Sequence, residues 1–92
     1  MVGRLIKSIY EYKDVTLESG TKITANQVYI KDGVVNQIDN GTVYLNEQQF
    51  SFSIYPYGIN GKLQYNLNNV PSDINGQEIL KEFVDFVEAD IQ

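Results

Sequence analysis

The sequence contains no cysteine, no histidine and no tryptophan, and it has only one methionine and two prolines. Without cysteine, the chain can form neither disulfides nor thiolate metal sites. Without histidine, it lacks the most common general base and the most common zinc ligand. Carboxylates, lysines and tyrosines remain for acid–base chemistry, and nothing in the sequence shows them converging. We therefore expect no enzymatic activity, no metal site and no cofactor.

Long hydrophobic runs are also missing. No stretch approaches the ~20 apolar residues that a membrane helix needs, and no apolar signal-peptide region follows Met1. These features predict a cytoplasmic protein without membrane contact. A length of 92 residues leaves room for one domain, residues 1–92. Hydrophobic and aromatic contents of 42% and 12% are typical of a folded domain.

Basic residues are scarce in the C-terminal part of the chain, where the acidic residues are concentrated. The net charge is −5, yet acidic and basic residues balance up to Pro71. From Ser72 onward, six acidic residues accompany a single basic one, Lys81. A nucleic-acid partner is not expected, because binding phosphates requires a basic face. The distribution is instead compatible with a basic protein partner.

Residues 75–91 have the spacing of an amphipathic helix. Their large apolar side chains fall within an arc of roughly 160°, and these are Ile79, Leu80, Phe83, Val84, Phe86, Val87 and Ile91. Asn75 is the predicted N-cap, with Glu78 three residues later as in a capping box. Glu88 and Asp90 lie unfavourably at the negative end of the helix dipole. The last turn is therefore expected to fray unless a cation meets it.

Residues 2–70 predict an antiparallel β-meander of five to seven strands, with the helix covering one face or end. Such a meander is mainly β and can curl into a small open barrel. Residues 4–12 fit either a strand or a short helix, and their isoleucine and tyrosine content favours the strand. The alternative is an α+β roll with an extra short N-terminal helix beside the last one.

Asp32-Gly33 and Asn40-Gly41 supply the positive φ angles of type I′ turns. Both dipeptides therefore predict hairpin turns within the meander. A three-residue loop over residues 19–21 is also expected, and it would place Leu17 opposite Ile23.

A last hairpin is predicted to turn at Asn60-Gly61, with Ile54 opposite Leu67. One face of this hairpin is apolar and the other is polar. The polar face carries the side chains that most resemble a binding surface, namely Tyr55, Tyr57, Gln64 and Asn66.

Three helix carboxylates, Glu78, Glu82 and Asp85, form an acidic stripe with i, i+4, i+7 spacing. Such a stripe is usually a solvated face that aids solubility. Alternatively, it is a docking surface for lysines or arginines of a partner.

The leading functional hypothesis is a non-catalytic protein-interaction module, such as an adaptor, an assembly subunit or a small inhibitor. The alternative is a domain that binds a small ligand or carbohydrate through Tyr55 and Tyr57. A small barrel that binds single-stranded nucleic acid is the third hypothesis. Self-association through an unpaired edge strand is compatible with each of them.

Overall fold

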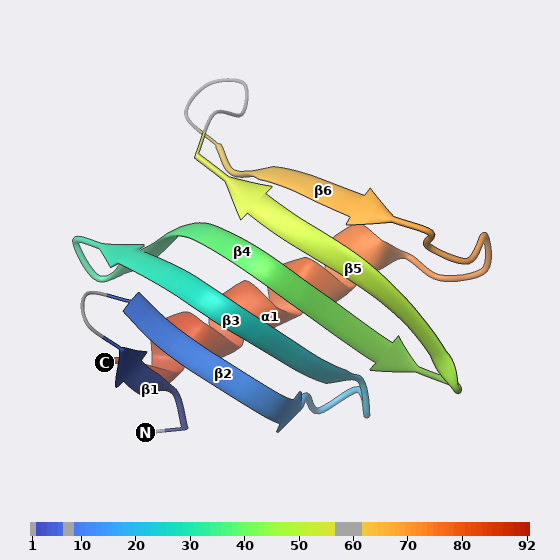
Figure 1. Ribbon diagram of the computed structural model, residues 1–92, viewed down its shortest axis with the longest axis horizontal. Coiled ribbons are helices and arrows are strands. Elements are labelled where there is room, and N and C mark those ends of the chain that lie inside the picture. Colours follow the sequence, from blue (N-terminus) through green and yellow to red (C-terminus); the bar gives the residue numbers. More distant parts are fainter. Residues whose placement is uncertain (1, 7–8, 57–61) are drawn as a thin grey trace.

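The computed structural model describes residues 2–6, 9–56 and 62–92. In these ranges, six strands form one antiparallel sheet in which strand order follows the chain. The strands are β1 (Arg4–Ile6), β2 (Ile9–Thr16), β3 (Lys22–Lys31), β4 (Val34–Leu45), β5 (Gln48–Tyr55) and β6 (Gln64–Asn68). The helix α1 (Gly76–Asp90) crosses one face of the sheet diagonally (Figure 1). The sheet stays open, with β1 and β6 at its edges, so the predicted meander with a C-terminal helix is confirmed.

The N-terminal segment is extended. β1 and β2 pair antiparallel, with Leu5 opposite Tyr10, so the alternative fold with an N-terminal helix is wrong. Packing of Tyr12 gives the physical reason. This fully buried ring makes edge contacts with Phe83 and Phe86 of α1, with centroids 5.9 and 6.2 Å apart. A strand brings Tyr12 onto the covered face of the sheet, where its apolar ring is removed from water.

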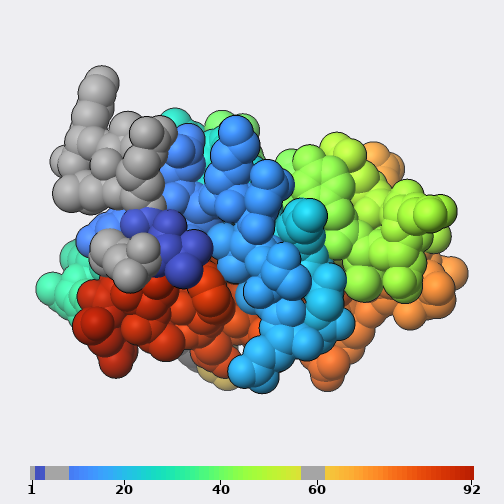
Figure 2. All heavy atoms as spheres, turned by 90° about the horizontal axis from the view of Figure 1, so that it is seen from below, coloured from blue at the N-terminus to red at the C-terminus, as the bar shows by residue number. Residues whose placement is uncertain are grey.

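The apolar side of α1 seals one face of the sheet, as its spacing predicts. Leu80, Phe83, Val84 and Val87 are buried, while Ile79 and Phe86 are half-buried against the same core. Figure 2 shows the red helical residues gathered on one side of the blue strands. We call the face under α1 the inner face and the opposite one the outer face. The inner face of the strands supplies the remaining buried core, which includes Val15, Ile23, Val28, Ile38, Val43, Phe50, Phe52 and Ile54.

The helix begins as predicted. Asn75 is its N-cap, and the side-chain oxygen Oδ1 of Asn75 accepts a hydrogen bond of 3.3 Å from the backbone N–H of Glu78. This bond satisfies one of the N–H groups that the first helical turn leaves without a partner.

Two predicted registers are wrong by two residues. Ile23 lies opposite Val15 instead of Leu17, because the connection is longer than three residues. The N–H of Leu17 donates to the carbonyl oxygen of Thr21 (2.8 Å), which closes the loop at residues 17–21. In the last hairpin, Ile54 lies opposite Tyr65 instead of Leu67. A shift by two keeps each side chain on its predicted face, and the expected turn at residues 60–61 lies outside the described residues.

The turn at Asp32-Gly33 is confirmed, with φ angles of 55° and 79°. The predicted turn at Asn40-Gly41 is wrong, because both residues lie inside β4. Asn40 has a φ of 56°, and the register between β4 and β5 shifts at this point, so the dipeptide forms a β-bulge. A Cβ on Gly41 would lie 2.3 Å from Cζ of Phe52, so glycine leaves room for this buried ring.

The chain reverses later than predicted. Asn46 and Glu47 connect β4 to β5, with φ angles of 52° and 64°, and Leu45 lies opposite Gln48. Both central residues of this two-residue turn have positive φ, which is the type I′ geometry. Neither residue is glycine, so the sequence carries no strong turn signal here.

Candidate functional site

Polar side chains of β5 and β6 lie together on the outer face. Tyr55 is the cross-strand partner of Gln64, and Ser53 is the partner of Asn66. Nε2 of Gln64 donates a hydrogen bond of 3.4 Å to Oδ1 of Asn66. The structure therefore brings together Tyr55, Gln64 and Asn66, which we call the polar strip. Tyr57 is also a predicted site residue, but it lies outside the described residues.

β6 forms an edge of the sheet, and no other strand in the described ranges pairs with its far side (Figure 1). Its sequence, QYNLN, contains no charged residue and no proline. Gln64 and Asn68 are exposed. Natural edge strands are usually protected from pairing with other chains by lysines, prolines or bulges. The edge of β6 has none of these protections.

The helix carboxylates lie away from the polar strip, because α1 covers the inner face and the strip lies on the outer face. Glu78 and Asp85 are exposed, as expected for a docking or solvated surface. Glu82 is half-buried, and its Oε2 accepts hydrogen bonds of 3.4 Å from the backbone N–H and the hydroxyl of Ser19. The six predicted site residues that the structure describes thus belong to two separate surfaces, and Glu82 also tethers the β2–β3 connection.

Two carboxylates of α1 influence the hydroxyl group of Tyr65 in β6. Burial is the main reason that the pKa of the Tyr65 hydroxyl is raised, and the charges of Asp85 and Glu88 add to it. Both carboxylates therefore lie close enough to β6 to influence it. The polar strip on the outer side of this edge, by contrast, contains no charged side chain.

Asp90, in the last helical turn, holds the N-terminal segment through its carboxylate. Asp90 accepts hydrogen bonds from the backbone N–H groups of Val2 (2.6 Å) and Gly3 (2.9 Å) and from the hydroxyl of Tyr12 (2.7 Å). Burial acts to raise the pKa of the Asp90 carboxyl, but these donors, together with the charge of the N-terminal amino group, outweigh it, so the pKa is lowered. The last turn of α1 therefore carries a carboxylate that binds the N-terminal segment, and the positive N-terminal charge acts on it, as the expectation of a cation required.

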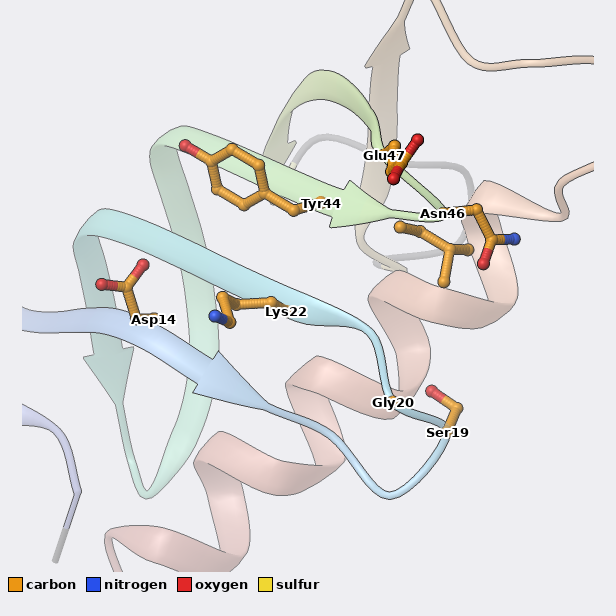
Figure 3. Close-up of a pocket in the computed structure, with 8 residues that line it drawn as sticks. Asp14, Ser19, Gly20, Lys22, Tyr44, Asn46 and Glu47 are labelled. Atoms are coloured by element: carbon orange, nitrogen blue, oxygen red, sulfur yellow. The ribbon is translucent and has the colours of Figure 1, made fainter.

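Among the hollows lined by described residues, two lie beside the irregular parts of the sheet. The larger, about 630 Å³, lies between the β2–β3 loop and the β4–β5 turn (Figure 3). Lys22 and Tyr44, which are cross-strand partners, lie between Asp14 on one side and the Asn46-Glu47 turn on the other. This lining mixes both signs of charge. The smaller hollow, about 350 Å³, lies next to the bulge at Asn40.

Sequence reasoning missed both hollows. They are formed by bulges and turns whose residues have positive φ without being glycine, such as Asp14, Asn40 and Glu47. An Asn-Gly pair within a β-prone segment was the available signal for the smaller one. Such a pair favours a bulge as well as a turn.

None of the described ranges contains a helix with the length and apolar character needed to cross a membrane. Within the same ranges, no group of three or more acidic side chains is arranged to hold a metal ion. The features of the described residues that could bind a ligand or partner include the polar strip, the edge of β6, the helix carboxylates and the two hollows. Comparisons of the chain with protein-family models, with curated proteins and with solved structures give no match.

Proposed function

We propose that the protein is a non-catalytic protein-interaction module that binds an extended segment of a basic partner protein along β6. The observation that carries this proposal is the edge strand itself, which is uncharged, free of proline and, within the described ranges, unpaired along its far side. Backbone N–H and C=O groups on such an edge pair readily with an added strand.

Neighbouring side chains give the proposed interface its specificity. Tyr55 supplies a large contact area with a polar tip and few torsions to immobilise, and Gln64 and Asn66 offer both donors and acceptors. Asp85, exposed on α1 and close enough to influence Tyr65, favours lysine or arginine next to the added segment. Opposite charges of this kind mainly increase the association rate, and salt weakens their effect.

A photo-crosslinking amino acid at Asn68, an exposed residue at the end of β6, tests the proposal in the organism that makes the protein. The control carries the same group at Thr16, which is exposed on β2. A basic protein captured from position 68 but not from position 16 is then purified, and its affinity is measured. We expect Asn68→Lys to weaken binding roughly tenfold or more, because an added charge at an edge opposes strand pairing. Thr16→Lys, with the same change in charge, should leave affinity unchanged.

Equal capture from both positions, or equal affinity of the Asn68→Lys and Thr16→Lys variants, would contradict the proposal. Sedimentation of the protein alone provides a further check. A dimer that Asn68→Lys dissociates would show that a second copy of the chain, and not another protein, occupies the edge.

A further inference from the structure

The smaller hollow lies on the outer face where β4 departs from regular strand geometry. Asp39 and Asn40 lie between the buried residues Ile38 and Gly41, whose partners on β5 are Ile54 and Phe52. Two residues of β4 therefore face Ser53 alone. Because a bulge interrupts the alternation of side chains, both Asp39 and Asn40 can face outward, and both are at least partly exposed.

The pairing of β2 with β3 also shifts in register, close to the shift between β4 and β5. Asn26 and Gln27 of β3 lie where the pairing of β2 with β3 is irregular, between the buried residues Ala25 and Val28. Gln27 is the cross-strand partner of Asp39. The two irregular segments are therefore adjacent, and together they place several polar side chains next to one another on the outer face.

The hollow is lined mostly by hydroxyl and amide groups. Among the described lining residues, one side chain, Asp39, is charged. The uncharged polar side chains of the lining include Gln27, Asn40, Ser53, Tyr55 and Asn68. Sites for drug-like molecules are usually lined by apolar groups with few polar ones. This lining therefore suits a strongly polar ligand, and it offers no cation that could bind an anion.

Part of the lining is fixed by hydrogen bonds. Nε2 of Gln37 lies 3.2 Å from each carboxylate oxygen of Asp39, to which it donates. Nδ2 of Asn40 donates to Oε1 of Gln27, also at 3.2 Å. These contacts orient the carboxylate and one amide before any ligand arrives, which lowers the entropy cost of binding.

Three other polar side chains of the hollow form no hydrogen bond within the described part of the chain. The side chains of Ser53, Tyr55 and Asn68 make no hydrogen bond to any residue that the structure describes. Within the described ranges, no protein side chain or backbone group occupies these donors and acceptors. A fixed carboxylate next to unpartnered hydroxyl and amide groups is an arrangement that binds a ligand by many directional hydrogen bonds.

We infer that this hollow binds a neutral, hydroxyl-rich ligand, namely a single sugar ring or the terminal sugar of a glycan. Sugar hydroxyls donate and accept, as do the amides and hydroxyls of the lining. The Asp39 carboxylate accepts from two neighbouring hydroxyls in strong, charge-assisted bonds. The Tyr55 ring offers an apolar surface for the face of the sugar. This inference does not depend on the proposed interaction along β6.

Nuclear magnetic resonance of the full chain tests the inference directly. Methyl glycosides of glucose, galactose, mannose and N-acetylglucosamine are titrated to roughly 50 mM, because a single ring binds weakly. We expect at least one glycoside to shift the backbone amides of Asn40, Gly41 and Ser53 in a saturable manner. Asp39→Asn should weaken this binding roughly tenfold or more, because it removes the charge-assisted bonds.

Glu18→Gln is the matched control, since it removes an exposed carboxylate from the β2–β3 loop, outside the lining of the hollow. Its affinity for the glycoside should equal that of the unaltered chain. Ser53→Ala provides a second test within the hollow if Asp39→Asn disturbs the fold. The inference is overturned if no glycoside shifts these amides, or if the hollow variants and the control bind equally well. Loss of glycoside binding with capture through β6 retained would separate this site from the proposed function.

Discussion

At the scale of single residues, Asp90 shows how a locally unfavourable side chain is used by the fold. A carboxylate at the C-terminal end of a helix opposes the helix dipole. Here it accepts three hydrogen bonds, two from the backbone of Val2 and Gly3 and one from the hydroxyl of Tyr12. These donors come from residues far away in the sequence. Helical spacing alone therefore predicted the position of Asp90 but not its role.

Replacing this carboxylate by Asp90→Ala should lower the free energy of unfolding at neutral pH by about 1.5–3 kcal/mol, the range for hydrogen bonds to a charged group. Because the pKa of Asp90 is lower in the folded chain than in the unfolded one, its contribution is complete above the unfolded pKa. The contribution is then lost as the pH falls through the folded pKa. Chemical denaturation across acidic pH checks this, and the deficit of the variant should shrink toward zero at the lowest pH.

The control for this series is Asp85→Ala, which removes an exposed helix carboxylate with no recorded hydrogen-bond partner in the described residues. It should change stability by less than about 0.5 kcal/mol. An Asp90 deficit that stays constant with pH would contradict the assigned role of the charge.

At the scale of elements, the strength of each local pattern decided what could be predicted. The amphipathic spacing of residues 75–91 and the cap at Asn75 gave the helix to within one residue at each end, because both signals act locally. Registers were harder to predict. They depend on loop hydrogen bonds such as that from Leu17 to Thr21 and on the packing of Phe52 against Gly41. No local sequence pattern indicates either of these two contacts.

The candidate site was predictable to a similar degree. Alternation along β5 and β6 placed Tyr55, Gln64 and Asn66 on one face, even though the register was shifted by two residues. The smaller hollow was not predictable, since it requires the bulge of β4 at Asn40 to lie next to irregular pairing of β3. Long-range geometry of this kind appears only in the folded sheet.

The β4–β5 turn offers a prediction at this scale. Glu47 adopts a φ of 64°, which is costly for a residue with a side chain, whereas glycine adopts it freely. Glu47→Gly creates the preferred Asn-Gly sequence of a type I′ turn and should stabilise the protein by about 0.5–1 kcal/mol. Chemical denaturation measures the gain. Glu47→Ala keeps the Cβ and should give no comparable gain, so equal effects of the two variants would disprove strain at this position.

At the scale of the whole molecule, the sheet has one sealed face and one open face. Large side chains of α1 cover the inner face, whereas polar residues and the β6 edge remain accessible elsewhere. Burial of each large helix side chain contributes about 1.5–3 kcal/mol as an upper estimate. Four such side chains, Leu80, Phe83, Val84 and Val87, are buried. Their sum is similar to the net stability of a small domain, about 5–15 kcal/mol.

A chain that ends at Pro71 should therefore lose its cooperative thermal transition, because its inner face would be exposed to water. Calorimetry and the dispersion of amide resonances measure this loss. A chain that ends at Asp90 retains α1 and serves as the control, which should still unfold cooperatively. A sharp transition in the shorter chain would show that the sheet folds without its helix.

The central claim is that a partner adds a strand to β6. Hydrogen exchange of backbone amides, measured on the full chain with and without the crosslinked partner, tests it most directly. We expect at least roughly tenfold slower exchange in the complex for those β6 amides whose N–H groups point away from β5, because an added strand would accept hydrogen bonds from them. Amides of β1, at the opposite edge, should exchange at unchanged rates. Unchanged exchange in β6 together with new protection elsewhere would contradict the account.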